Sequence, residues 1–270
     1  INTFVGGLSA SGGAVTGSHN VGVGAETLYY LTSGASNVAV GYQAGAGITT
    51  GSSNVAIGRE ALETEDVGGQ SVAVGFSALQ LQNVDGDVYN TAVGAFAGQN
   101  TVSGASNTFI GGLAGRNNTG GSNTAVGAAA LDAAVSGAQN TSVGVNCLGV
   151  VTGDANSNTG LGVQAGASIT TGDNNMALGL DALQTGSPGG AQTTGSNKIG
   201  LGDETITSCH VQVDWTVASD QRDKTDFTTL DLGLDFVKAL APVTYKWDKR
   251  SKYGDKYADG YDLNAQTPDG

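Results

Sequence analysis

One glycine recurs along the first three quarters of this 270-residue chain, and its spacing limits the fold more than any other feature. Successive copies lie 16 to 19 residues apart, with one last step of 23. They are Gly6, Gly24, Gly41, Gly58, Gly75, Gly94, Gly111, Gly127, Gly144, Gly162, Gly179 and Gly202. The residue before each copy is always Val, Ile or Leu. Short self-similar units of this kind are typical of solenoids.

A unit of about 17 residues suits two short strands and two tight turns, because Thr-Gly, Ser-Gly or Gly-Gly pairs punctuate each unit. We therefore predict an all-β fold over residues 1–202, a parallel β-solenoid or β-roll in which each unit forms one coil. The 45 glycines and the aromatic content of 6% argue against a conventional globular interior. A triple-stranded β-spiral, in which each repeat advances along a fibre, is the competing geometry.

Each repeat alternates with the period of two that characterises a strand. The branched residue before the glycine and the Thr, Val, Met or Ile two positions earlier share one strand face. The other face carries Asn, a small residue and Gly. We expect the branched residues to point inward and the small face to point outward, where it would allow close approach of neighbouring rolls.

Asparagine opens ten of the repeats, from Asn2 to Asn175. A column of this kind fits a ladder in which stacked amides bond to one another along the solenoid. A single roll has few inward side chains and open ends, so we expect self-association, with three chains as the working number.

Charge is distributed unevenly. Only Arg59, Arg116 and Lys198 are basic before Gly202, and eight of the 11 Lys and Arg residues follow it. This shift places a domain boundary near residue 203, with a linker over 203–218 and a small α+β segment over 219–270. The net charge of −13 excludes a phosphate-reading surface and so predicts no nucleic-acid partner. No apolar run approaches the roughly 20 residues of a membrane helix, so we predict no membrane insertion.

Cys147 occupies a repeat column otherwise filled by small residues. We interpret it as a packed side chain rather than half of a disulfide with Cys209.

Several groups were weighed as chemical sites within the repeats. The longer unit at 82–87 and the insertion at 184–196 are candidate binding loops, although tolerated surface insertions explain them equally well. Oxygen-bearing side chains at 85–87 and 172–174 lack a calcium β-roll signature. His19 and His210 lack metal-ligand spacing. We predict no metal and no cofactor. A carboxylate pair for glycan hydrolysis and a solvated acidic loop are the two interpretations of the acidic group Glu60, Glu63, Glu65 and Asp66.

The repeat motif Asn-Thr/Val-Ala-Val/Ile-Gly, seen as Asn-Val-Ala-Val-Gly at 37–41 and Asn-Val-Ala-Ile-Gly at 54–58, resembles the Asn-x-Val-Ala-Ile-Gly unit in the head repeats of trimeric autotransporter adhesins and repeats found in phage tail fibres. That resemblance covers residues 1 to about 202 and implies a β-roll that assembles with three-fold symmetry.

The chain changes character at Ser219-Asp220-Gln221-Arg222-Asp223-Lys224. Leucines and valine from Leu230 to Leu240 then fall at helical spacing, Pro242 ends that helix, and Val243–Trp247 alternates as a strand. The pattern Ser-Asp-x-Arg-x-Lys, continued by Gly-Leu-Asp-Phe-Val-x-x-Leu-x-Pro-Val-x-Tyr-x-Trp over 233–247, resembles the C-terminal intramolecular chaperone of endosialidases and other phage tail proteins. The family's later segments are not recognisable over 248–270, so we expect this module to be incomplete here.

The chaperone resemblance implies a module that assembles as a trimer, templates the upstream fibre and cuts itself free beside Ser219. It gives Ser219 as nucleophile and Lys224 as general base, with Asp220 and Arg222 in support. A serine hydroxyl needs a neighbouring base, and lysine serves only when its pKa falls, which burial or the cation of Arg222 would favour. Any enzyme activity is thus at most single-turnover autoproteolysis by a Ser-Lys dyad.

Together these features predict a homotrimeric phage tail fibre on the virion, which attaches to a host glycan or protein receptor and contacts other tail proteins. A trimeric adhesin on a bacterial surface and a tail-spike glycan hydrolase are the alternatives.

Overall fold

The computed structural model describes residues 1–133 and 136–212. The chain divides into two units, Ile1–His210 and Val211–Gly270. Apart from residues 211 and 212, the described residues all belong to the first unit. The predicted helix at Leu230–Leu240, the predicted strand at Val243–Trp247 and most of the linker lie outside the described residues, so these predictions and the domain boundaries remain predictions.

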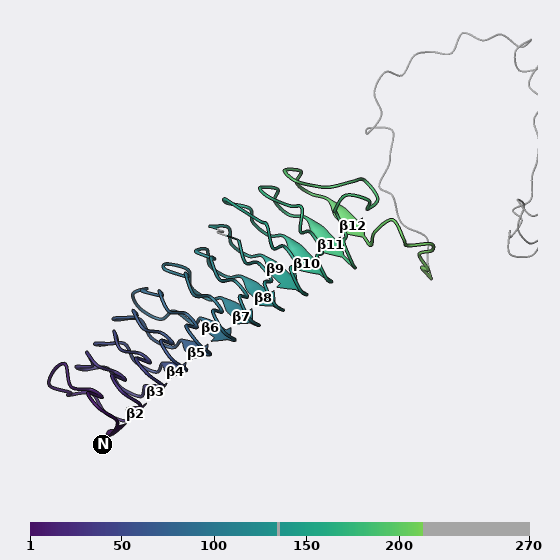
Figure 1. Cartoon of the computed structure of the whole chain (residues 1–270). Helices are drawn as coiled ribbons and strands as arrows, with labels where there is room; N and C mark the ends of the chain where they lie inside the picture. Colours follow the sequence, from purple (N-terminus) through teal and green to yellow (C-terminus); the bar gives the residue numbers. More distant parts are fainter. Residues whose placement is uncertain (134–135, 213–270) are drawn as a thin grey trace, which may run out of the picture. The chain divides into compact units, whose positions relative to one another are not determined.

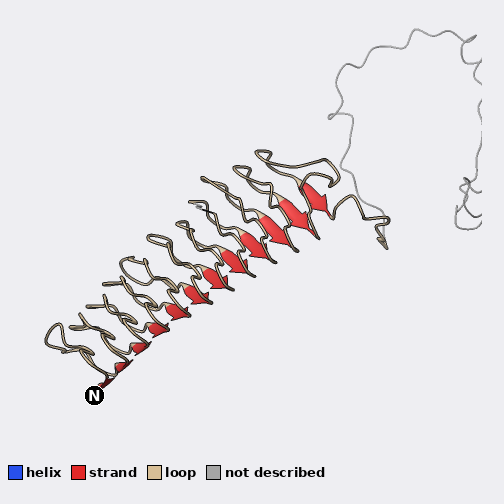
Figure 2. Ribbon diagram, in the orientation of Figure 1, coloured by secondary structure: helices blue, strands red, loops and turns tan. Residues whose placement is uncertain are grey.

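Residues 1–210 form a stack of coils whose strands line one side (Figure 1). Each coil contributes one strand of three residues, and turns and loops make up the rest (Figure 2). The coils are numbered by their strands, so the fifth coil contains β5. The strands are β1 Thr3–Val5, β2 Val21–Val23, β3 Val38–Val40, β4 Val55–Ile57, β5 Val72–Val74, β6 Thr91–Val93, β7 Thr108–Ile110, β8 Thr124–Val126, β9 Thr141–Val143, β10 Thr159–Leu161, β11 Met176–Leu178 and β12 Ile199–Leu201.

The twelve strands form one sheet in chain order, β1 to β12, and each pairs in parallel with the next. Equivalent repeat positions are opposite each other, as in Val38 against Val55 and Ala39 against Ala56. This in-register stacking of one chain on itself confirms the parallel solenoid of about 17 residues per coil over the β-spiral. The expectation of two strands per coil is wrong, because the far side of each coil is built of turns.

The predicted orientation of the strand faces is also wrong. The middle residue of each strand from β2 points inward and is buried, whereas the branched residues on either side are exposed or half-buried. The inward residue is Ala39 in β3 and Ala92 in β6, both fully buried. The outward neighbours include Val40, Ile57 and Val93. A narrow coil of this length has little interior volume beside the strand, so small side chains fill it and the branched ones face out.

Larger apolar side chains enter the interior from the turns. Leu28, Leu62, Leu79, Leu131 and Leu148 are fully buried and stack with the inward alanines. Their backbone is left-handed, as it is for Leu62 with φ of 52°. Left-handed backbone costs about 1–2 kcal/mol for a residue with a side chain. At least two such residues occur in every one of the first eleven coils, so a single coil is strained and depends on its neighbours for burial.

The interior adjusts its volume from coil to coil. Phe109 replaces the usual small residue of β7 and is fully buried. Gly98 of the preceding coil and Gly115 of the same coil flank its ring at a repeat position that is leucine in several other coils, and a Cβ at Gly98 or Gly115 would lie 2.7 or 2.3 Å from the Phe109 ring. Likewise a Cβ at Gly160 would lie 2.4 Å from the Sγ of Cys147. Large and small residues thus exchange places along the stack so that no void remains.

The asparagine ladder is confirmed, although it lies inside the solenoid and not on its outer face. Asn158 is a typical member. Its backbone N–H donates to Oδ1 of Asn140 at 3.0 Å, and its own Oδ1 accepts the N–H of Asn175 at 3.0 Å. Its Nδ2 spans the interior to the carbonyl oxygen of Gly172 at 2.9 Å, in the far turn of the same coil. Each asparagine therefore closes its own coil and binds the next.

Candidate functional site

The predicted self-cleavage residues Ser219 and Lys224, with the supporting Asp220 and Arg222, lie outside the described residues. Their geometry is therefore not described, and their roles stay predictions. Candidate surfaces were sought in residues 1–133 and 136–212.

Glu65, one of the four carboxylates weighed for glycan hydrolysis, is a buried structural group. Its Oε1 accepts the N–H of Gly68 at 2.7 Å and its Oε2 accepts Nε2 of Gln82 at 2.7 Å. It is fully buried. A carboxylate held in this way inside the coil can neither reach a substrate nor be solvated, so neither interpretation of the acidic group holds for Glu65.

Gln82 explains why this carboxylate lies inside. The fifth coil begins with Ser71 where most others have asparagine, and the serine side chain is too short to cross the coil. Gln82 fills the position: its Nε2 also donates to Ser71 Oγ at 2.9 Å, and its Oε1 accepts Nδ2 of Asn90 at 2.8 Å. The first of the extra residues at 82–87, Gln82, thus compensates for the asparagine that is missing at position 71. This compensation has a signal in the sequence: this repeat, which lacks the asparagine, is also the one with the 19-residue step, from Gly75 to Gly94.

The other three carboxylates of that group remain on the surface and are each hydrogen-bonded. Glu60 pairs with Arg59 at 2.7 Å and accepts Nε2 of Gln80 at 3.2 Å. Glu63 accepts the same Nε2 at 2.8 Å. Asp66 accepts the hydroxyl of Thr49. Amide and hydroxyl partners, as in an ordinary surface network, occupy these carboxylates.

The candidate binding loop at 82–87 and the oxygen-bearing segment at 172–174 carry few convergent polar groups. At 82–87, the Tyr89 hydroxyl donates to Asp87 Oδ2 at 3.3 Å. At 172–174, Asp173 Oδ1 accepts the backbone N–H of Asn156 in the preceding coil, and its own N–H donates to Ser196 Oγ. Across 1–133 and 136–212, no group of three or more His, Cys, Asp or Glu side chains is placed to hold a metal ion.

Cys147 is a free, buried cysteine, and Cys209 is free and exposed. Burial raises the pKa of the Cys147 thiol above its usual value, although contacts with Ser142 and the Val143 backbone oppose that shift. The thiolate is the reactive form. The interpretation of Cys147 as a packed small residue, and not half of a disulfide, is confirmed.

One ion pair joins the turns of the seventh and eighth coils. Arg116 Nε lies 3.1 Å from Asp132 Oδ1. Burial raises the pKa of Asp132 above its usual value, and the nearby Arg116 offsets part of that rise. Because both partners are already matched, this pair is better suited to joining two coils than to binding a ligand.

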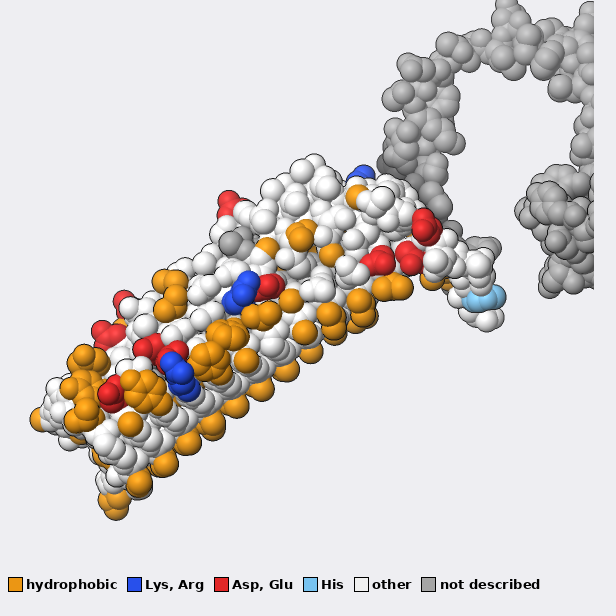
Figure 3. All heavy atoms as spheres, viewed as in Figure 1, with side chains coloured by type: hydrophobic (Ala, Val, Ile, Leu, Met, Phe, Trp, Pro, Cys, Tyr) orange, Lys and Arg blue, Asp and Glu red, His pale blue; other side chains and the backbone are white. Residues whose placement is uncertain are grey.

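The outward face of the sheet is an apolar surface that repeats with the coils. It consists of the two outward residues of every strand, here called the sheet face. Its side chains form a regular row along the edge where the strands lie (Figure 3). Exposed members include Val23, Val40, Ile57, Val93 and Ile110, at 36–41%. The second outward residue is Val, Ile or Leu in every strand, whereas the first is Thr in six of the twelve. An apolar column of this length on one chain marks an interaction surface.

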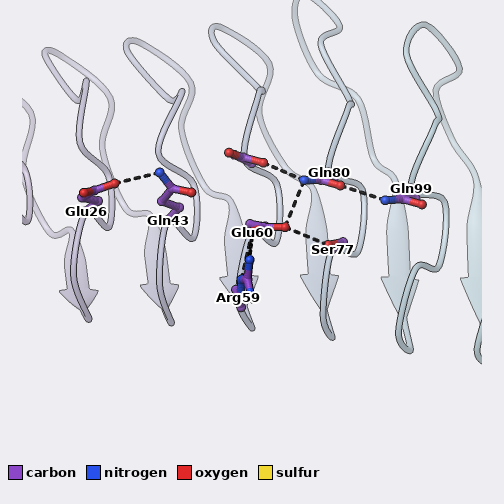
Figure 4. A network of polar contacts seen from close by, with 8 residues as sticks. Glu26, Gln43, Arg59, Glu60, Ser77, Gln80 and Gln99 are labelled. Atoms are coloured by element: carbon purple, nitrogen blue, oxygen red, sulfur yellow. Dashed lines mark hydrogen bonds and ion pairs between the residues drawn. The ribbon is translucent and has the colours of Figure 1, made fainter.

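A second surface combines aromatic and polar side chains over coils two to six. In Figure 3, apolar, acidic and basic side chains gather together on the first half of the stack. The guanidinium of Arg59 lies 6.0 Å from the Tyr42 ring centroid and 5.5 Å from that of Phe76. Figure 4 shows polar side chains of successive coils bonded in line, from Glu26 to Gln43 and from Gln80 to Gln99. The surface is thus preorganised by contacts between coils.

Within 1–133 and 136–212, no helix has the length and apolarity needed to span a bilayer. Comparison with known families finds one match, in which residues 219–262 match the family described as chaperone of endosialidase. No curated protein and no solved structure matches the chain. The matched segment contains Ser219, Asp220, Arg222 and Lys224.

Proposed function

We propose that this chain is a trimeric fibre protein of a phage tail, in which the solenoid reaches toward a host receptor and a C-terminal intramolecular chaperone directs assembly. The observation that carries the proposal is the match of residues 219–262 to the chaperone of endosialidase, directly after a β-solenoid. A β-solenoid joined to this family's module is the arrangement of a tail fibre or spike, and its place would be the virion.

The sheet face supports assembly from several copies. Its valine, isoleucine and leucine side chains are exposed in a single chain, and burying a valine side chain is worth roughly 1.5–3 kcal/mol. In three parallel copies, such side chains from all twelve strands would lie opposite their equivalents in the neighbouring copies. Such long parallel contacts are non-local and slow to align, so a terminal module that sets the register first has a physical purpose.

A lysine at the sheet face should weaken assembly, and one elsewhere should not. Val93 and Val102 belong to the same coil and are 38% and 47% exposed, but only Val93 lies on the sheet face. We expect Val93→Lys to raise the protein concentration at which trimers dissociate at least tenfold, because three ammonium groups would be buried together. Val102→Lys should behave as wild type. Light scattering over a dilution series measures both, and equal behaviour of the two variants would remove the sheet face as the interface.

We further propose that the module cuts the chain once beside Ser219. Ser219 Oγ attacks the carbonyl carbon of the adjoining peptide bond and Lys224 takes the hydroxyl proton. The C–N bond breaks, Lys224 returns the proton to the leaving amine, and water hydrolyses the resulting ester, with Asp220 and Arg222 supporting the pair. The cation of Arg222 favours a lower lysine pKa, which a general base at neutral pH requires. Cleavage would release the chaperone after the fibre has formed.

Mass spectrometry of the freshly expressed full chain tests this step. Wild type should give two fragments that meet at Ser219, whereas Ser219→Ala and Lys224→Ala should remain whole, because each removes one partner of the dyad. Ser208→Ala, a serine among the exposed residues that precede the module, is the control and should cleave normally. Cleavage in Ser219→Ala, or an intact wild-type chain, would contradict the proposed autoproteolysis.

The two alternatives make different demands. A bacterial trimeric adhesin needs a C-terminal membrane anchor in its full gene, and the tail fibre needs the rest of the chaperone. A tail-spike hydrolase would release new reducing ends from host capsule, whereas a passive fibre would bind the capsule without cutting it.

A further inference from the structure

A pocket lies on the aromatic and polar surface near the beginning of the solenoid. Its volume is about 290 Å³ and its lining comes from three successive coils. The lining residues are Leu8, Glu26, Tyr29, Tyr30, Gln43 and Ala46. Pockets for small ligands span roughly 300–1,000 Å³, so this one suits a single compact ring of a larger molecule.

Two polar side chains on adjacent coils are fixed against each other in this pocket. Gln43 Nε2 donates to Glu26 Oε2 at 2.7 Å (Figure 4). Neither side chain makes another hydrogen bond within the described part of the chain. The second carboxylate oxygen of Glu26 and the amide oxygen of Gln43 therefore remain as acceptors. The ligand must supply donors, such as hydroxyl groups.

The walls of the pocket are aromatic and aliphatic. The rings of Tyr29 and Tyr30 meet edge to face, with centroids 4.7 Å apart and planes at 88°. Tyr29 is held in place because Gly12 of the first coil has no side chain: a Cβ there would lie 3.1 Å from the ring. Tyr30 is 56% exposed, as is Leu8 at 59%. The face of an exposed tyrosine ring, with its phenolic hydroxyl at the edge, suits a ring that is apolar on its faces and polar at its rim.

We propose that this pocket binds a neutral hexopyranose unit of a surface glycan. A pyranose has C–H groups on its faces and hydroxyl donors around its rim, which match the tyrosine walls and the two acceptor oxygens. This inference rests on the proposed function, since it assigns the receptor class and the place where that receptor is bound.

The charges of the pocket favour neutral over acidic sugars. None of the lining residues is basic, and Glu26 adds a negative charge to a protein with a net charge of −13. Arg59, two coils away from Glu26, is already paired with Glu60 at 2.7 Å. A sialic or uronic acid would bring its carboxylate toward Glu26 with no cation to receive it.

Calorimetric titration of the full chain tests the proposal with stated probes. The neutral probes are maltohexaose, cellohexaose and mannohexaose, and the acidic probes are hexamers of galacturonic acid and α2,8-linked sialic acid. We expect at least one neutral probe to bind at least tenfold more tightly than either acidic probe. Tyr30→Ala should weaken that binding tenfold or more, because it removes the exposed wall.

Glu26→Gln is the sharper variant. Its backbone φ of 58° matches that of Gln43 at 55°, which fills the same repeat position in the next coil, so glutamine is tolerated there. Neutral binding should weaken, because an amide donor replaces the second acceptor oxygen of Glu26, and the preference for neutral over acidic probes should fall at least fivefold, because the negative charge is lost. Tyr89→Asn, at an exposed tyrosine beside the 82–87 loop, is the control and should leave binding unchanged.

Three results would overturn the pocket assignment: no binding by any neutral probe, equal binding of acidic probes, or loss through Tyr89→Asn without loss through Tyr30→Ala. The same preparations are checked for trimer mass and for cleavage at Ser219. A trimeric, cleaved fibre that binds no neutral probe rejects the pocket and leaves the proposed function standing. A monomeric, uncleaved chain rejects the proposed function, and the titration still decides the pocket.

Discussion

Replacing Gly111 by alanine should prevent the seventh and eighth coils from stacking. The backbone φ of Gly111 is 131°, which L side chains rarely adopt, and a Cβ would lie 2.6 Å from the carbonyl oxygen of Gly127 in the next coil. The contact is with backbone, so no side chain can rotate away. Strain and overpacking together should cost about 2–6 kcal/mol.

The neighbouring glycine gives a matched control. A Cβ at Gly112 would meet nothing closer than the Ala95 carbonyl oxygen at 4.0 Å, and its φ lies outside the left-handed region. Earlier coils carry Tyr42, Arg59 and Phe76 at this repeat position. Gly112→Ala should therefore change stability by no more than about 1 kcal/mol, in the stabilising direction, because alanine restricts the unfolded chain.

Chemical denaturation at fixed protein concentration, together with hydrogen exchange of each coil, measures this pair. Gly111→Ala should lower the denaturation midpoint sharply and increase exchange in the coils around 107–139. Equal midpoints for Gly111→Ala and Gly112→Ala would show that the backbone contact between these glycines is not what limits the close stacking of the coils.

The periodicity of the sequence was sufficient to predict the architecture. Every strand from β1 to β12 ends at the residue before a repeat glycine. That agreement follows from sterics, because the chain turns where only glycine can adopt the required backbone and approach the next coil. One strand per coil was harder to foresee, since the glycine-rich far turn contains β-compatible residues that bond between coils without forming a ladder.

Alternation showed that each strand has two faces, but it did not show which face lies inside. Ranking the residues by hydrophobicity puts Val40 inward and Asn37 outward, and the structure has the reverse. The missing quantity was volume: the coil interior accepts Ala39, the turn leucines and a hydrogen-bonded asparagine. Valine and isoleucine left outside are then evidence for partners, and not for a core.

How far each site could be predicted depended on the kind of sequence signal behind it. The Ser219 motif rested on resemblance alone, and its residues lie outside the described part of the chain. The acidic group combined one buried residue, Glu65, with surface residues, because residue types alone do not show whether a side chain points into the coil or out of it. The pocket beside Tyr29 and Tyr30 could not be predicted, since it forms from side chains of three coils that lie about 17 residues apart and meet only after stacking.

Asn158→Ala should destabilise the solenoid strongly, because it removes one member of the asparagine ladder. It leaves the Gly172 carbonyl oxygen and the Asn175 N–H without the side-chain partners at 2.9 and 3.0 Å. Both groups are inside the coil, and each unsatisfied buried group costs about 1–3 kcal/mol. A total of about 2–6 kcal/mol follows from the two groups, which approaches the whole stability of many domains, roughly 5–15 kcal/mol.

The fifth coil shows what a tolerated loss requires. Ser71 lacks the amide, and Gln82 supplies it by bonding to Ser71, Glu65 and Asn90. The tenth coil has Ile169 at the position equivalent to Gln82, so no neighbour can replace Asn158 and Asn158→Ser should be as harmful as Asn158→Ala.

Thermal denaturation of these variants beside Asn83→Ala, an exposed asparagine of the 82–87 loop, measures the difference. Since each coil of a solenoid contacts only its neighbours, breaking one rung should separate the stack into two blocks that unfold at different temperatures. A single transition at the wild-type temperature for Asn158→Ala would mean that backbone pairing alone holds the coils together, and that the buried ladder follows from stacking instead of stabilising it.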